Sequence, residues 1–199
     1  MHRCEVKPVG WWADRFRRRL RPVAALALAI PLLAPSIAES ISSADPLASL
    51  NVQSLPQPIP APVVALESPD GRSLRLEDLR GKVVFLNFWA TWCVPCREEM
   101  PAMERLHRAY GEHGLVIVAV NFKESRAETQ KYIKELGLTL GVALDPDGAA
   151  ASTFGVRGLP VTFLLARNGR ILWKALGSRE WDNPAGRAYF EKVLDAPRP

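Results

Sequence analysis

The feature that most constrains the fold is an apolar run that leads directly into a pair of cysteines. Residues 82–90, KVVFLNFWA, are almost wholly apolar and rich in β-formers, which is typical of a central strand covered on both faces. Cys93 and Cys96 follow at once in WCVPC, and a helix is predicted from about residue 93 to residue 110. The sequence therefore predicts a buried strand that delivers a CxxC pair to the start of a helix.

Strand and helix signals alternate through the following residues. Residues 63–66 and 73–79 flank the turn residues SPDG and predict a small hairpin. A buried strand is expected at 114–122. The helix after it should begin at Ser125 as its N-cap and end at Gly137.

The last third of the chain predicts antiparallel strands and a final helix. A short strand at 142–145 and a small helix at 149–154 come first. Asn168-Gly169 lies between two apolar runs and predicts a tight hairpin, and residues 181–194 read as an amphipathic helix. Strand-helix-strand units followed by a hairpin predict an α/β fold with a central mixed β-sheet flanked by helices on both faces, extended at its N-terminal side by the first hairpin.

The first 60 residues differ in composition from the rest. A basic segment is followed by an uncharged, largely apolar run that ends at Ala38, so residues 1–38 predict either an export signal or an uncleaved membrane anchor. Both alternatives place the rest of the chain outside the cytoplasm, because basic residues stay on the cytoplasmic side. Residues 39–60 are rich in Ser and Pro and predict a linker, and residues 61–199 carry the predicted domain.

The net charge of +5 belongs to this leader. Residues 1–22 hold seven of the 26 Lys and Arg residues and two of the 21 Asp and Glu residues, so the remainder carries 19 of each sign. A body without net charge offers no general attraction for phosphate, and binding to nucleic acid is not expected.

The position of the two cysteines gives them distinct predicted roles. A thiolate at a helix N-terminus is stabilised by the free N–H groups and the helix dipole, so Cys93 is the expected nucleophile. Cys96 lies inside the first turn, where it can close a disulfide but is poorly placed for attack from solvent. Cys93 is therefore predicted to form a mixed disulfide with a substrate, and Cys96 to release it.

Three other uses of a CxxC pair fit the sequence less well. A purely structural disulfide would close too small a loop to stabilise the chain much. A zinc site needs further ligands, and the body offers only His107 and His113. Covalent haem attachment requires CxxCH, whereas Arg97 follows Cys96. No metal site is predicted.

Three segments together carry a resemblance to a known family. KVVFLNFWATWCVPCREEMPAMERL, then GLVIVAV, then GVRGLPVTFLLARNGRIL occur in this order. They resemble the TlpA-like family of exported, thioredoxin-fold thiol-disulfide oxidoreductases over about residues 61–195. The resemblance implies a thioredoxin-like domain at 61–199 that works without a dissociable cofactor.

The resemblance also implies a contact surface for the substrate. Pro160 matches the proline that is cis in thioredoxin-like folds and faces the cysteine pair. Trp92, Val94, Pro95 and Leu159 would then surround Cys93 together with it.

A proton acceptor for Cys96 is less obvious. Asn87 occupies the place where many thioredoxins have a buried Asp, and asparagine cannot titrate. Glu99, three residues after Cys96, neighbours it on the helix and matches an acidic position in some TlpA-like reductases. Glu99 is a candidate proton acceptor, and the alternative is a solvated carboxylate that stabilises the helix start. Trp173 and Trp181 are expected in the core.

The first functional hypothesis is an extracytoplasmic reductase of protein disulfides. The resemblance suggests a membrane thiol electron donor and substrates such as cytochrome c precursors, although Val161 stands where the dedicated cytochrome-maturation branch has Glu. One alternative is a copper-binding or copper-delivery module using both thiols, with Met100 and Met103 nearby on the helix. The other is a peroxiredoxin-like peroxidase, which would use a lone cysteine rather than a CxxC pair.

Overall fold

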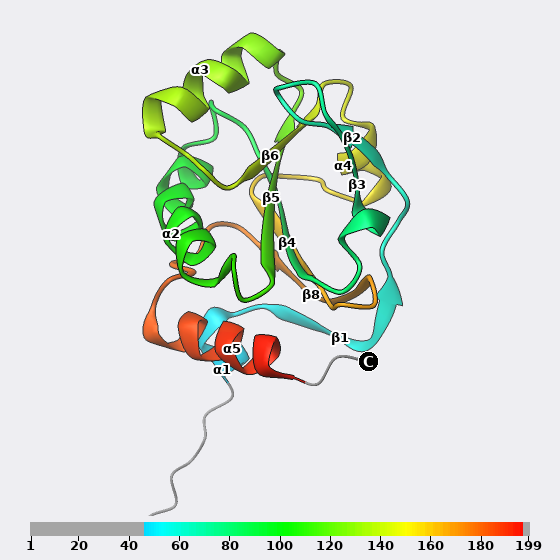
Figure 1. Ribbon diagram of the computed structural model, residues 1–199, viewed down its shortest axis with the longest axis vertical. Helices are drawn as coiled ribbons and strands as arrows, with labels where there is room; N and C mark the ends of the chain where they lie inside the picture. Colours follow the sequence, from blue (N-terminus) through cyan, green and yellow to red (C-terminus); the bar gives the residue numbers. More distant parts are fainter. Residues whose placement is uncertain (1–45, 197–199) are drawn as a thin grey trace, which may run out of the picture. The chain divides into compact units, whose positions relative to one another are not determined.

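The computed structural model describes residues 46–196 of the chain (Figure 1). The elements, in chain order, are α1 (Pro46–Leu50), β1 (Gln53–Pro60), β2 (Ala65–Glu67), β3 (Ser73–Arg75), the 3-10 helix η1 (Leu76–Leu79), β4 (Val83–Trp89), α2 (Val94–Tyr110), β5 (Leu115–Phe122), α3 (Arg126–Leu136), β6 (Gly141–Asp145), α4 (Ala149–Thr153), β7 (Val161–Leu165), β8 (Arg170–Leu176) and α5 (Pro184–Asp195).

The strands form one mixed sheet in the order β1-β8-β7-β4-β5-β6-β2-β3. Strands β4, β5 and β6 run parallel, and β7 and β8 are antiparallel to their neighbours. The carboxyl ends of the three parallel strands therefore meet at one edge of the sheet, next to the start of β7. The predicted α/β fold with a central mixed sheet is confirmed.

Strand β4 supplies side chains to two separate cores. All seven of its residues are buried, and successive side chains point to opposite faces of the sheet. Phe85 and Trp89 join the core under α2 and α5, whereas Leu86 and Phe88 join the core under α4 and the β2–β3 hairpin. Asn87 faces the same side as Phe85, and this parity directs its side chain towards α2.

The helix ends follow the predicted chemistry. Ser125 caps α3, and its hydroxyl accepts a hydrogen bond from Glu128 N while the Glu128 carboxylate accepts one from Ser125 N, which is a full capping box. Gly137 ends the helix in the left-handed conformation. Helix α5 begins at Pro184 with Asn183 as its N-cap, later than the predicted start, because a proline is favoured in the first turn.

Both predicted hairpins are present. Strands β2 and β3 pair antiparallel, with Leu66 opposite Leu74. Strands β7 and β8 are joined by the predicted turn, in which Gly169 has a φ of 77° that favours glycine and Arg170 N donates to Asn168 Oδ1.

The structure corrects the predicted linker. Residues 46–60 fold as α1 and β1, and β1 adds an antiparallel strand to the edge formed by β8, as Figure 1 shows beside α1 and α5. Its prolines are compatible with this position, because an edge strand leaves one row of backbone groups unpaired. Leu50 anchors α1, with a side chain that is only 2% exposed.

The predicted leader, residues 1–38, lies outside the described residues. Among residues 46–196, no helix combines the length and the apolar character that crossing a membrane requires.

A buried carboxylate holds the connection between α3 and β6. Glu104, on α2, accepts hydrogen bonds from Thr139 N at 2.9 Å, from Leu140 N at 3.0 Å and from the Thr139 hydroxyl. Arg108 Nε donates to Glu104 Oε1 at 2.8 Å. Burial alone would raise the pKa of Glu104, but these hydrogen bonds lower it to about 2.

We expect Glu104→Gln to destabilise the protein by roughly 3 kcal/mol at pH 7. The pKa of Glu104 in the folded protein lies below that of an unfolded glutamate. The ionised carboxylate therefore makes its full contribution to the free energy of unfolding above about pH 4.5, and this contribution is lost as the pH falls towards about 2. Urea unfolding of both proteins at pH 7 and pH 3 measures this. Glu112→Gln, at an exposed position, serves as control. If the free energies of unfolding of the natural protein and Glu104→Gln differed equally at both pH values, the low pKa of Glu104 would be contradicted.

Candidate active site

The cysteine pair lies where the sequence predicts it. Cys93 is the N-cap of α2, and it forms a disulfide with Cys96 across a Cα–Cα distance of 5.3 Å. The backbone N–H of Cys96 points at Cys93 Sγ at 3.3 Å. A helix N–H aimed at this sulfur stabilises negative charge on it once the disulfide opens.

Both cysteines are buried, and Cys93 is the slightly more exposed of the two. Cys96 is fully buried, Cys93 is 5% exposed, and the neighbouring side chains of Trp92 and Val94 are 64% and 60% exposed. Large apolar side chains in water beside a sulfur offer a surface for a polypeptide. This arrangement agrees with Cys93 as the attacking residue, and the assignment of the two roles stays a prediction.

The predicted proline lies at the same end of the sheet. Val161 pairs with Phe88, so the residue before it, Pro160, adjoins the carboxyl end of β4, from which the chain continues to Cys93. The Leu159–Pro160 peptide bond is cis, as the resemblance implies. Pro160 is buried and Leu159 is half-buried, while Pro95 is exposed in the first turn of α2.

Glu99 is buried, so its interpretation as a solvated carboxylate is wrong. Glu99 is only 2% exposed, and its carboxylate accepts three hydrogen bonds. Asn87 Nδ2 donates to Oε1 at 2.8 Å, and Trp181 Nε1 and the backbone N–H of Arg179 donate to Oε2 at 2.8 and 3.2 Å. Asn87, which cannot titrate, therefore serves as a donor to a group that can.

Burial is the main influence on this carboxylate. It raises the pKa of Glu99 to about 7, and the hydrogen bonds from Trp181 and Asn87 keep it from rising further. Because Glu99 follows Cys96 by three residues, the two side chains are neighbours on α2. A group that both gains and loses a proton near neutral pH thus lies one helical turn from the buried thiol.

Arg179 was not predicted to take part in the site. Its backbone N–H donates to Glu99, while its guanidinium donates from Nε to Leu50 O at 3.0 Å and from Nη2 to Asn51 O at 3.1 Å. The end of α1 thus fixes the loop between β8 and α5, and this loop in turn donates hydrogen bonds to Glu99. No local sequence signal connects residues this far apart along the chain.

Glu124 is a second residue that the sequence interpretation missed. It accepts hydrogen bonds from Thr91 N at 2.7 Å, from the Thr91 hydroxyl and from Asn121 Nδ2 at 2.6 Å, and Thr129 in turn donates to Asn121 Oδ1. This network fixes the residues just before Cys93. The sequence held one signal for it, since Asn121 is a polar residue near the end of the apolar run predicted as a strand at 114–122.

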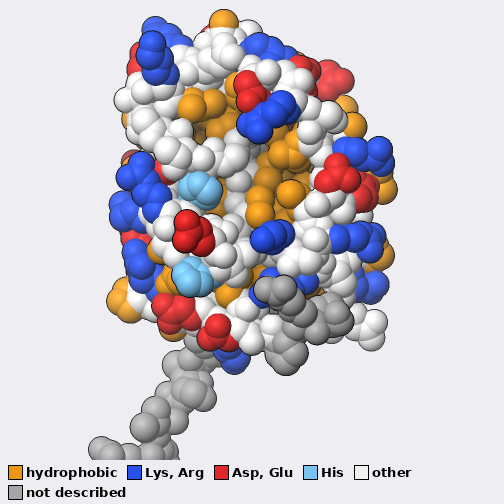
Figure 2. Space-filling view, in the orientation of Figure 1, with side chains coloured by type: hydrophobic (Ala, Val, Ile, Leu, Met, Phe, Trp, Pro, Cys, Tyr) orange, Lys and Arg blue, Asp and Glu red, His pale blue; other side chains and the backbone are white. Residues whose placement is uncertain are grey.

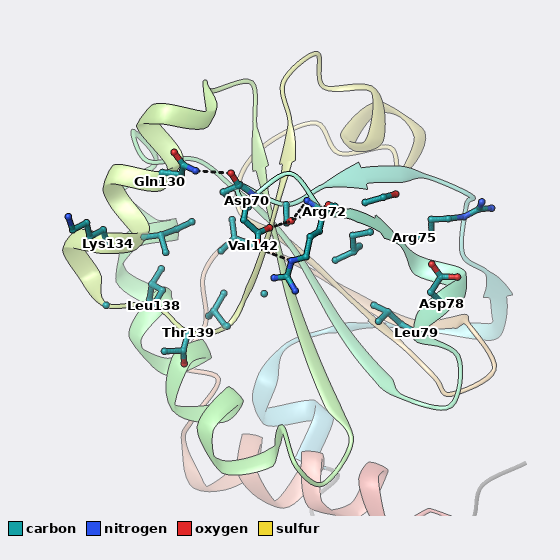
Figure 3. Close-up of a pocket in the computed structure, with 18 residues that line it drawn as sticks. Asp70, Arg72, Arg75, Asp78, Leu79, Gln130, Lys134, Leu138, Thr139 and Val142 are labelled. Carbon is teal, nitrogen blue, oxygen red and sulfur yellow. Dashed lines mark hydrogen bonds and ion pairs between the residues drawn. The ribbon is translucent and has the colours of Figure 1, made fainter.

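A separate hollow of about 940 Å³ lies between β3, η1 and α3. Figure 3 shows Leu79, Leu138 and Val142 within it and Arg72 paired with Asp70 at its side, and Figure 2 shows apolar side chains gathered on this face. None of the predicted site residues lines this hollow.

Comparison with known proteins agrees with this geometry. The model of the AhpC/TSA family matches residues 59–174. The chain belongs to the AhpC/TSA family. Within it, the chain is 43% identical over 111 residues to the thiol-disulfide oxidoreductase ResA of Geobacillus thermodenitrificans (strain NG80-2), an alignment that covers 56% of this chain and 64% of that protein. It is 35% identical over 133 residues to ResA of Bacillus thuringiensis (strain Al Hakam), covering 67% and 76%.

Solved structures of thiol:disulfide interchange proteins are similar to this chain as well. The crystal structure of a candidate thiol:disulfide interchange protein DsbE from Chlorobium tepidum matches with a TM-score of 0.65 and 35% identity, covering 71% of this chain and 99% of that one. The solution structure of a thiol:disulfide interchange protein from Bacteroides sp. matches with a TM-score of 0.62 and 26% identity, covering 73% and 95%. The predicted fold, family and enzyme class, a thiol-disulfide oxidoreductase, are confirmed.

Replacing Trp181 tests the hydrogen bonding of Glu99. Trp181→Phe keeps an aromatic ring in the core but removes the N–H donated to Oε2, so we expect the pKa of Glu99 to rise above about 7 by about one pH unit. Carboxyl ¹³C NMR titration measures this. Trp173→Phe is the matched control, because the Trp173 N–H donates to Tyr189 instead. Equal shifts in both variants would refute a specific role for Trp181.

Proposed function

We propose that this protein works outside the cytoplasm as a dithiol reductant of protein disulfides. The observation that carries the proposal is the Cys93–Cys96 disulfide at the start of α2, with a buried carboxyl group one turn further along. The predicted export signal or anchor at residues 1–38 supports the location. The names of the ResA relatives support the chemistry.

The first step is attack on the substrate. The thiolate of Cys93 bonds to one sulfur of the client disulfide, and the other client sulfur leaves as a thiolate and takes up a proton. The exposed side chains of Trp92 and Val94 contact the client polypeptide around the reacting sulfur, together with Pro95, Leu159 and Pro160.

The second step resolves the mixed disulfide. Cys96 gives its proton to Glu99 and its thiolate attacks Cys93 Sγ, which forms the Cys93–Cys96 disulfide and expels the second client sulfur as a thiolate that takes up a proton. The client gains two electrons and the cysteine pair loses them. A pKa near 7 suits Glu99 to this transfer, because it can accept the proton and return it to solvent at neutral pH.

A membrane thiol donor would restore the dithiol, and cytochrome c precursors are one class of client that fits the family resemblance. The copper alternative has less support. Met100 and Met103 are fully buried in the core, and within residues 46–196 no three His, Cys, Asp or Glu side chains are grouped as metal ligands.

Trapping tests the roles of the two sulfurs. In Cys96→Ser the resolving thiol is gone, so we expect a stable mixed disulfide between Cys93 and a client, seen by non-reducing electrophoresis and mass spectrometry. Cys93→Ser is the matched control and should trap no client. Equal trapping by both variants would show that the roles are assigned wrongly.

The reduction potential tests the direction of electron transfer. CxxC proteins span roughly −270 mV to −120 mV, and a reductant belongs at the negative end. We expect titration against glutathione to give a value nearer to −270 mV. A value near −120 mV would make the protein an oxidant and would overturn this part of the proposal.

A further inference from the structure

A groove of about 510 Å³ begins at the cis proline and runs away from the cysteines. Leu159 and Pro160 form its near end, the loop from Phe154 to Gly158 forms one wall, and β7 and β8 form its floor. The floor belongs to the sheet face opposite to α2, where Val161 and Phe163 are buried and Leu176 is exposed. Val161 pairs with Leu176 and Phe163 pairs with Lys174, so these four side chains point to the same side.

The charges in this groove all have one sign. Arg157 and Lys174 line it, and no Asp or Glu does. Among residues 46–196, neither cation takes part in a salt bridge. Arg157 is exposed and Lys174 is half-buried. The groove thus presents two unpaired positive charges above an apolar floor, in a body whose sequence outside the leader carries no net charge.

The groove is open to an extended polypeptide. Its wall contains Gly155 and Gly158, and a Cβ added at either would meet no atom within 4 Å. On the floor, Leu176 is 51% exposed. In the proposed contact surface a client bound through its sulfur to Cys93 lies against Leu159 and Pro160, which form the near end of the groove, and each extended residue advances it by about 3.3 Å. Side chains within a few residues of the client cysteine therefore reach the groove.

We propose that this groove binds an acidic side chain of the client next to the disulfide that is reduced, so that Arg157 and Lys174 select clients with Asp or Glu close to the reacting cysteine. The inference rests on the proposed reductase function and adds the class of substrate. Exposed ion pairs change affinity by up to about fivefold each, so the effect is a preference among clients and not an absolute requirement.

Three disulfide peptides that are identical except for one residue beside the cystine test this proposal, with Glu, Gln or Lys at that position. For the natural protein we expect kcat/KM to fall in the order Glu, Gln, Lys, by about fivefold between the first and last. The preference should shrink at high salt, because exposed charges are screened.

The double variant Arg157→Glu/Lys174→Glu should reverse the order, with the Lys peptide reduced fastest. Lys82→Glu is the matched control, because Lys82 is exposed and precedes β4 at the end of the strand opposite to Cys93. It should keep the natural order. Reversal by the groove variant alone supports the proposal.

Two negative results are distinguishable. If the natural protein reduces all three peptides equally, or if the groove variant keeps the natural order, the groove does not select acidic clients and the inference is wrong while the reductase function stands. If no peptide is reduced although the dithiol form is verified by thiol titration, the proposed function itself fails.

Discussion

The hydrogen bonds to the Glu99 carboxylate are the interaction on which the candidate redox site depends. A carboxylate buried without partners costs several kcal/mol when it ionises, and here three donors reduce that cost. Asn87 comes from the central strand, and Trp181 and Arg179 come from the loop between β8 and α5. The same bonds therefore stabilise the charge and fix the helix that carries the cysteines against the sheet.

Two carboxylates on α2 show how the surroundings decide what a residue can do. Glu104 faces backbone N–H groups and Arg108, its pKa is about 2, and it stays ionised as a structural acceptor. Glu99 is more deeply enclosed and its pKa is about 7. Between about pH 4.5 and 7 the folded protein holds a proton on Glu99 that the unfolded chain has released, so stability falls by roughly 3 kcal/mol as the pH rises through this range. The carboxyl group of Glu99, the proposed proton acceptor, is thus maintained at a cost in stability, whereas Glu104 contributes stability.

The parts of the fold that local chemistry determines could be predicted from the sequence. The apolar run of β4, the N-cap at Ser125 and the Asn168-Gly169 turn each act over a few residues, and all three occur where expected. The partners of Glu99 could not be predicted, because Trp181 lies 82 residues away and carries the same apolar signal as an ordinary core residue. The assignment of residues 46–60 to a linker was wrong for a similar reason. Ser and Pro weaken the local strand signal, and only pairing with β8, a strand more than a hundred residues later, makes that segment a strand.

The position of α1 also changes what belongs to the redox domain. The Arg179 guanidinium is held by the carbonyl groups of Leu50 and Asn51, and the same residue donates its N–H to Glu99. A chain that began at residue 61, the boundary that composition predicts, would lack both carbonyls and would leave the edge of β8 unpaired. The guanidinium would then lose fixed acceptors at a half-buried position. The loop that places two of the three donors to Glu99 would keep its ion pairs with Arg105 and Arg187 and the packing of Trp181, but it would lose its link to α1. The residues that precede the predicted domain therefore help to position the hydrogen-bond donors of Glu99, its proposed proton acceptor, and the folded unit includes residues 46–60.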